Sequence, residues 1–125
     1  MKHTILIADD SGSMRRSLQD MMNFLGHDTI TAYDGKSGLM AFIEGRKSID
    51  RVLTDCDMPA GDGIELIRQI RMLGSEVRIC LMSGRLNEAL QDLALKAGAT
   101  STFYKSDPNL VLLEALDIGK ATDPI

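Results

Sequence analysis

Five short runs of strand-forming residues recur along the chain. They occupy residues 5–8, 29–33, 51–54, 77–82 and 102–104. Several of these runs are continuously apolar instead of alternating between apolar and polar residues. That pattern is typical of parallel strands covered by helices on both faces. The runs therefore predict short strands at the centre of the molecule.

Segments with helical periodicity follow these runs. The apolar face of the first consists of Met14, Leu18, Met21, Met22 and Leu25. Ser11 and Ser13 are available as N-caps, and Gly26 ends this segment. Three further helices are expected over about residues 36–44, 63–73 and 86–97, each followed by a glycine. The last helix is expected to open with Asp107 as the cap and Pro108 as the first helical residue, and to extend to Ile118.

Strand and helix alternate five times along the sequence. This order predicts a doubly wound, flavodoxin-like α/β fold in which a five-stranded parallel sheet carries helices on both faces. We expect one domain over residues 1–119 and a short tail of residues 120–125. In such folds the functional residues lie beyond the carboxyl ends of the strands, so these positions are the first to inspect.

The composition indicates a single globular domain. The chain has 125 residues, of which 44% are hydrophobic and 26% are charged, which argues against a disordered or membrane-embedded protein. The net charge of −4 disfavours direct binding of nucleic acid. The first apolar run is too short for a signal peptide or a membrane span. Cys56 and Cys80 have no metal-ligand spacing and form no disulfide framework, which favours reduced thiols in a cytoplasm.

Polar residues directly follow four of the predicted strands. They are Asp9 and Asp10 after the first, Asp55 after the third, Ser83 after the fourth and Lys105 after the fifth. Because the carboxyl ends of parallel strands meet at one edge of a sheet, we expect these side chains to share a pocket. Three neighbouring carboxylates ionise together only at a high cost, so either one keeps its proton or a divalent cation lies among them. Such hard oxygen ligands suit Mg²⁺.

A metal site beside a carboxylate, a lysine and a hydroxyl group is suited to phosphoryl transfer, which depends on positioning and on neutralising charge. A carboxylate can itself be the nucleophile and form an aspartyl phosphate. Asp55 is the best candidate because it ends the central strand. Taken singly, these residues are more simply helix caps, turn residues or solvated charges. Their joint placement at four strand ends favours a shared site.

The strings around these residues resemble the receiver domain of two-component response regulators, in particular the small single-domain regulators of the chemotaxis type. The matching strings are Ile5-Leu6-Ile7-Ala8-Asp9-Asp10-Ser11 with Met14-Arg15-Arg16, then Asp55-Cys56-Asp57-Met58-Pro59-Ala60-Gly61-Asp62-Gly63, Met82-Ser83-Gly84, and Ala97-Gly98-Ala99 before Lys105. The resemblance covers residues 2–119, nearly the whole chain. It implies a switch that is controlled by phosphorylation.

The resemblance also implies a metal site. Asp55 would accept a phosphoryl group from a phosphohistidine of a sensor kinase or a phosphotransfer protein. Asp10 would bind Mg²⁺ directly and Asp9 mainly through water. The backbone carbonyl of Asp57 would supply a further ligand beside Asp55.

Two other residues would contact the phosphoryl group in such a receiver. Ser83 would bond one of its oxygens, and Lys105 would pair with its charge. The domain would catalyse its own phosphorylation and dephosphorylation in the cytoplasm. It would pass the signal to a downstream protein, without direct contact to nucleic acid or membrane.

The sequence departs from the family pattern at two positions. Receivers usually follow the lysine with proline, in a cis peptide bond, where this chain has Ser106 after Lys105. A cis bond before a residue other than proline costs about 3 kcal/mol, so we expect either a trans bond with a shifted loop or a strained cis bond that is kept because it aims Lys105. The resemblance favours the cis form. Receivers also usually carry an aromatic residue three positions before the lysine, where this chain has Thr102. The departure at Thr102 predicts an altered readout.

Two other functions fit parts of the same pattern. One is an interaction module with the receiver fold that works without phosphate, since a fold can be kept while its function changes. The other is a phosphatase of the haloacid dehalogenase type, in which Asp55 attacks and Asp57 acts as the general acid. That family normally places its Asp-x-Asp motif after the first strand, whereas here the motif follows the third.

Overall fold

A five-stranded parallel sheet forms the centre of the computed structural model, which describes residues 1–122. The strands are β1 (Thr4–Ala8), β2 (Asp28–Ala32), β3 (Arg51–Asp55), β4 (Arg78–Ser83) and β5 (Ser101–Tyr104). They lie in the order β2-β1-β3-β4-β5. The doubly wound, flavodoxin-like fold is therefore confirmed, and every strand end lies within one residue of its predicted place.

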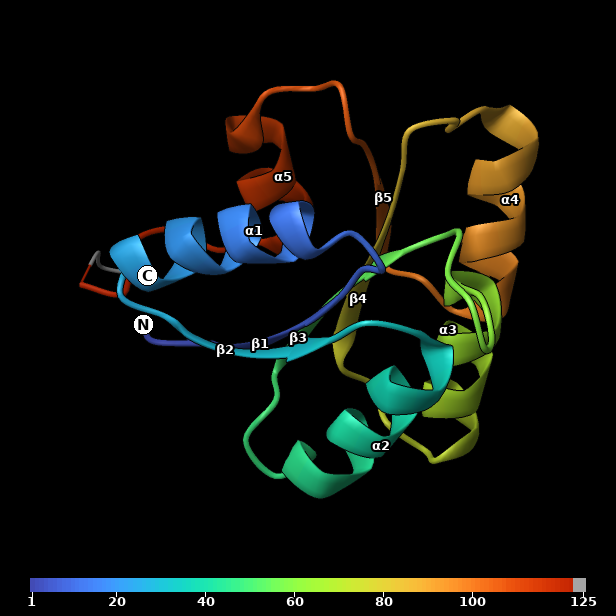
Figure 1. Ribbon diagram of the computed structural model, residues 1–125, viewed down its shortest axis with the longest axis horizontal. Helices are drawn as coiled ribbons and strands as arrows, with labels where there is room; N and C mark the ends of the chain where they lie inside the picture. The colour runs from blue at the N-terminus through green and yellow to red at the C-terminus, as the bar shows by residue number, and fades with distance from the viewer. Residues whose placement is uncertain (123–125) are drawn as a thin grey trace.

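Helices cover both faces of this sheet (Figure 1). On one face lie α1 (Gly12–Phe24) and α5 (Asn109–Leu116). On the other lie α2 (Gly35–Gly45), α3 (Gly63–Met72) and α4 (Glu88–Ala97). Within residues 1–122, no helix is both long enough and apolar enough to cross a bilayer.

The central strands contribute side chains to two separate cores. Ile5 and Ile7 of β1 pack with α1 and α5, whereas Leu6, between them, packs with α2 and α3. Val52 and Leu53 of β3 divide in the same way. All five side chains are fully buried. Burial on both faces of the sheet is the reason why these strands are continuously apolar.

Two helix starts differ from the sequence prediction. α4 begins two residues later than expected because the side chain of Asn87 accepts the backbone N–H of Leu90 and caps the helix there. At α5, Pro108 occupies the N-cap position and no side chain caps the helix. The expectation that Asp107 caps this helix is therefore wrong.

The apolar stripe of α4 is only partly buried. Ala94 and Ala97 pack into the core, but the Leu93 side chain is 50% exposed. Among the described elements, α4 makes its main contacts with α3 and the edge strand β5, so it lies at the rim of the sheet. The sequence stripe alone predicts a more deeply buried helix than the fold contains.

The segment after α5 packs against the turn between α1 and β2. The backbone N–H of Ala121 donates to the carbonyl oxygen of Leu25 at 2.8 Å. The buried ring of His27 forms a hydrogen bond with the carbonyl oxygen of Gly119. Residues 123–125 of the expected tail lie outside the described residues.

Candidate functional site

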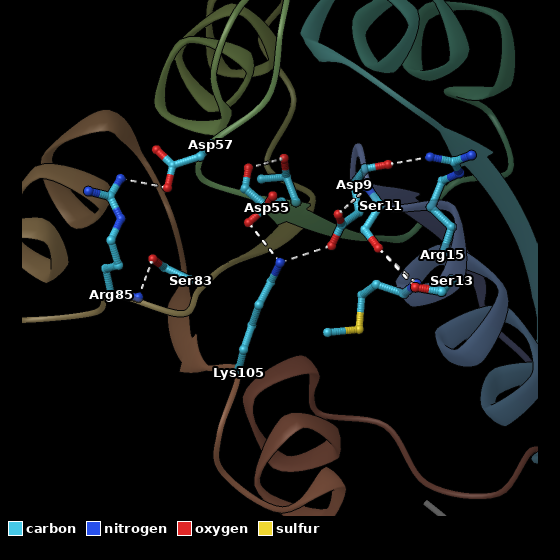
Figure 2. Close-up of polar contacts among 11 residues, drawn as sticks. Asp9, Ser11, Ser13, Arg15, Asp55, Asp57, Ser83, Arg85 and Lys105 are labelled. Atoms are coloured by element: carbon cyan, nitrogen blue, oxygen red, sulfur yellow. Dashed lines mark hydrogen bonds and ion pairs between the residues drawn. The ribbon is translucent and has the colours of Figure 1, made fainter.

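Side chains from four strand ends meet at one edge of the sheet (Figure 2). Asp55 and Ser83 are the last residues of β3 and β4, Asp9 directly follows β1, and Lys105 directly follows β5. In the sheet, β1 lies next to β3. The connection after β1 leads to β2 on one side of this pair, and the connection after β3 leads to β4 on the other side. In open α/β folds, loops that diverge at such a point of the sheet leave a crevice, which here falls above β1 and β3.

Three carboxylates lie together in this crevice. Asp9, Asp10 and Asp55 each offer an oxygen atom, and these atoms all lie within 4.8 Å of one another. Asp9 is fully buried and Asp55 is 6% exposed, whereas Asp10 is exposed to solvent. Two of the three negative charges are thus removed from water, and their mutual repulsion is poorly screened.

Lys105 provides a positive charge at this cluster. Its Nζ lies 3.1 Å from Asp9 Oδ2 and 3.1 Å from Asp55 Oδ1. The loop that carries it is fixed to β4, because the Lys105 backbone N–H donates to the carbonyl oxygen of Ser83 at 3.0 Å. Burial lowers the pKa of the Lys105 amine, but the hydrogen bonds and charges of Asp55 and Asp9 outweigh this and raise it overall. The ammonium group is therefore held in its charged form.

The same surroundings raise the pKa of the Asp55 carboxyl group above its usual value. Burial is the largest cause, and the charges of Asp9 and Asp10 act in the same direction. The hydrogen bond from Lys105 opposes them without cancelling them. One ammonium group thus does not compensate for the whole acidic cluster.

The cluster fits a small divalent cation. Its donors are carboxylate oxygens, which are hard ligands, and Mg²⁺ is commonly held by one or two carboxylates together with water. The exposure of Asp10 leaves one side of the cluster open to solvent. A cation bound at the cluster would lower the raised pKa of Asp55 and so favour its ionised form.

Ser83 lies at the same edge, under the loop between β4 and α4. Its side chain is buried, and its hydroxyl oxygen accepts the backbone N–H of Arg85 at 3.0 Å. The Arg85 guanidinium group reaches Asp57 in the loop after β3, at 2.6 Å. Both loops beside Asp55 are thus connected to each other (Figure 2).

Three residues near the site have contacts that sequence reasoning did not find. Arg15, which on its own resembles a solvated helix residue, donates from Nη1 to the carbonyl oxygen of Asp9 at 2.7 Å. The Thr54 hydroxyl donates to the carbonyl oxygen of Asp55 at 3.0 Å. Gly63 lies so close behind Asp55 that a Cβ atom there would be 2.1 Å from this carbonyl oxygen. In the sequence, the one indication of these roles is that Arg15 and Gly63 lie within the segments that resemble receiver domains.

Comparison with known proteins identifies the family. The model of the response regulator receiver domain matches residues 5–117. The chain belongs to this family. A solved receiver domain from Clostridium thermocellum superposes with a TM-score of 0.86 at 27% identity, over 92% of this chain and 91% of the other. The structure of the CheX-CheY-BeF3-Mg complex from Borrelia burgdorferi gives a TM-score of 0.85 at 27% identity, over 90% of this chain and 85% of that one.

Curated relatives of this receiver are longer proteins. Response regulator MprA of Mycolicibacterium vanbaalenii is 34% identical over 95 residues, which cover 76% of this chain and 40% of the relative. Transcriptional regulatory protein PrrA of Mycobacterium tuberculosis is 29% identical over 101 residues, which cover 81% of this chain and 42% of the relative. The chain therefore spans about two fifths of the length of these relatives.

The receiver places its lysine without the peptide geometry expected from the sequence. The described residues contain no cis peptide bond, so the Lys105–Ser106 bond is trans. Lys105 nevertheless contacts both Asp9 and Asp55. The expectation of a cis bond is wrong, because the backbone bond from Lys105 to Ser83 and the reach of the lysine side chain suffice to place Nζ in the crevice.

Proposed function

We propose that this receiver is a phosphorylation-controlled switch in which Asp55 accepts a phosphoryl group in a Mg²⁺-dependent reaction. The observation that carries the proposal is the placement of Asp55: a nearly buried carboxylate beside Asp9 and Asp10, with the Lys105 ammonium group 3.1 Å away. A carboxylate so placed combines a nucleophile with the charge compensation that phosphoryl transfer requires.

The proposed donor is a phosphohistidine on a sensor histidine kinase or a phosphotransfer protein. A carboxylate oxygen of Asp55 attacks the phosphorus atom and forms the new O–P bond. The P–N bond of the donor breaks, and its electron pair stays on the imidazole nitrogen. To end the signal, a water molecule attacks the same phosphorus atom. The O–P bond to Asp55 breaks with its electron pair on the carboxylate oxygen, and inorganic phosphate leaves with the protons of that water.

The other residues of the crevice each have a proposed task. Lys105 pairs with the charge of the phosphoryl oxygens. The Ser83 hydroxyl oxygen accepts the backbone N–H of Arg85. The hydroxyl proton of Ser83 therefore remains available to donate to a phosphoryl oxygen.

Asp10 and Asp55 would hold Mg²⁺ directly, Asp9 through water, and Asp57 through its backbone carbonyl. When bound, Mg²⁺ neutralises charge on the phosphoryl oxygens.

The signal would pass to a downstream protein by changes in the loops around Asp55. We place the domain in the cytoplasm, in keeping with two buried cysteines that form no disulfide. The net charge of −4 supports the proposal that this domain does not itself bind nucleic acid. Any output domain in a longer protein would carry that task separately.

Phosphoramidate tests the proposal, because it carries the same kind of P–N bond as phosphohistidine. Intact mass is measured after incubation with phosphoramidate and Mg²⁺, for the wild type, Asp55→Asn and Asp57→Asn. We expect one phosphoryl adduct in the wild type and none in Asp55→Asn. Asp57→Asn is the matched control and should keep the adduct, because Asp57 contributes its backbone carbonyl.

Other outcomes would contradict the proposal. A wild type without any adduct would favour an interaction module that works without phosphate. Sustained hydrolysis of p-nitrophenyl phosphate that is lost in both Asp55→Asn and Asp57→Asn would favour the phosphatase, in which Asp57 is the general acid. An adduct that persists in Asp55→Asn would place the acceptor elsewhere.

A further inference from the structure

The loop between β3 and α3 rests on the first turn of α2. The backbone N–H of Lys36 donates to the carbonyl oxygen of Ala60 at 3.0 Å, and that of Gly35 points to the carbonyl oxygen of Pro59 at 3.4 Å. The first N–H groups of a helix have no acceptor within the helix itself. Here the loop supplies these acceptors, so the loop and the start of α2 depend on each other.

The backbone of this loop is shaped to make that contact. Ala60 has a φ of 52° and Gly61 a φ of 98°, so two consecutive residues adopt left-handed conformations. Such a conformation is unfavourable for alanine and needs support from its surroundings. The loop carbonyls that result from it face the N–H groups of α2. The docking on α2 is therefore part of what holds the loop in its shape.

Only glycine fits at position 35. A Cβ atom on Gly35 would lie 2.1 Å from the carbonyl oxygen of Gly61, 2.6 Å from its carbonyl carbon and 2.9 Å from the carbonyl oxygen of Ala60. All three neighbours are backbone atoms, which cannot rotate away as the end of a flexible side chain can. A methyl group at this position must push the loop away from α2.

The first turn of α2 is itself rigidly fixed. The Asp34 carboxylate accepts the N–H of Ser37 at 2.7 Å, and the Ser37 hydroxyl accepts the N–H of Asp34 at 3.1 Å. These two hydrogen bonds form a capping box, which fixes the start of the helix. The bond from the Ser37 backbone N–H also lowers the pKa of Asp34. β2 leads into it directly, and the carbonyl oxygen of its last residue, Ala32, accepts the N–H of Asp9 at 3.1 Å. The support for the loop is thus tied to the carboxylate cluster.

We infer that Gly35 is a positioning residue for the metal site, acting through the loop that carries Asp57. The inference rests on the proposed function, in which the Asp57 carbonyl binds Mg²⁺. Asp57 lies two residues before Pro59, where the loop is held against α2. Mg²⁺ demands nearly ideal octahedral geometry at short distances, so a small displacement of one ligand weakens binding. The close contact of Gly35 with the loop keeps that carbonyl in place.

Gly35→Ala tests the inference against Gly45→Ala as the matched control. A Cβ atom on Gly45, at the other end of α2, would also be crowded, at 2.9 Å from Ile49 and 3.2 Å from Ile30. Titration calorimetry with Mg²⁺ should show the Kd of Gly35→Ala raised by about tenfold, the size typical of changes in groups that orient metal ligands. Gly45→Ala should keep the wild-type Kd. In phosphoramidate reactions, the Mg²⁺ concentration for half-maximal rate should rise for Gly35→Ala, while the rate at saturating Mg²⁺ approaches that of the wild type.

The wild type provides a second measurement in case Gly35→Ala fails to fold. During a Mg²⁺ titration, the amide signals of Gly35 and Lys36 should shift with the Kd of the site. Those of Ser48 and Ile49, beyond the other end of α2, should stay in place. If the Gly35 and Lys36 signals do not shift, or if a folded Gly35→Ala variant has the wild-type Kd, the inference about Gly35 is wrong while the proposed function still stands. A wild type that binds no Mg²⁺ would instead overturn the proposed function on which it rests.

Discussion

The Arg85 guanidinium group lies 2.6 Å from the Asp57 carboxylate and joins the loop after β4 to the loop after β3. Both side chains are exposed, so the pair is screened by solvent and adds little to stability. Its position matters more than its strength. The backbone N–H of Arg85 also bonds the Ser83 hydroxyl, so a movement of Ser83 toward a phosphoryl group would disturb the pair.

The response to phosphorylation should be concentrated in this loop. Beryllofluoride with Mg²⁺, a mimic of the phosphoryl group, should shift the amide signals of residues 83–87 strongly and those of β5 and α5 weakly. The reason is Thr102, which in place of an aromatic residue has too little area to report the movement of Ser83 by turning a ring inward. Partner discrimination would then depend on this loop and α4, with Arg85 and Asn87 the residues to test.

A Thr102→Tyr variant is the comparison for this prediction. It restores an aromatic side chain, so the beryllofluoride shifts should spread into β5 and α5. Amide spectra of both proteins provide the measurement. Large shifts throughout β5 and α5 of the wild type would show that Thr102 does not limit the response.

Mg²⁺ should stabilise the folded domain. The cation relieves repulsion among Asp9, Asp10 and Asp55. At a hundredfold excess over its Kd, the free energy of unfolding should rise by about 2.7 kcal/mol. Thermal unfolding with Mg²⁺ or with EDTA measures the difference. The Asp10→Asn variant should lose this gain, and in EDTA it should be at least as stable as the wild type. If millimolar Mg²⁺ leaves the melting temperature of the wild type unchanged, the prediction of a metal site at this cluster is wrong.

Without metal, the acidic cluster should make stability depend on pH. The pKa of Asp55 is raised in the folded state, mainly by burial, so the folded protein holds this proton to a higher pH than the unfolded chain does. The contribution of Asp55 to the free energy of unfolding therefore falls as the pH rises from the pKa of Asp55 in the unfolded chain, about 3.9, through its higher pKa in the folded protein.

Urea unfolding in EDTA between about pH 4 and pH 7.5 isolates this contribution when the wild type is compared with Asp55→Asn. Asparagine has no charge to bury, so the variant should gain stability relative to the wild type as the pH rises. A difference that stays constant over this range would show that Asp55 titrates alike in the folded and unfolded protein.

Replacing Ala60 by glycine should stabilise the domain. Ala60 has a φ of 52°, a left-handed conformation that glycine adopts without steric cost. The free energy of unfolding should increase by about 1 kcal/mol, after the greater freedom of glycine in the unfolded chain is subtracted. Ala89→Gly, in the first turn of α4, is the control and should lower it, because glycine is a poorer helix former than alanine. Urea unfolding measures both, and a destabilised Ala60→Gly would mean that the loop holds Ala60 in another conformation.

The sequence alone determined the order and kind of the elements. Continuous apolar runs such as residues 5–8 can be buried on both faces only in the middle of a layered sheet, and helices must then supply the covering. The parallel arrangement sent Asp9, Asp55 and Lys105 to one edge. These conclusions depend on local periodicity and on topology, both of which are readable along the chain.

Only the tertiary structure decided which atoms touch. The contact of Lys105 with Asp9 joins residues 96 positions apart, and it forms with a trans bond before Ser106 where a cis bond was expected. Gly35 meets Gly61 because α2 and the loop after β3 pack side by side, and Leu93 stays half exposed because α4 lies at the rim. Distances of this kind follow from how whole elements pack against each other, which residue spacing along the chain does not encode.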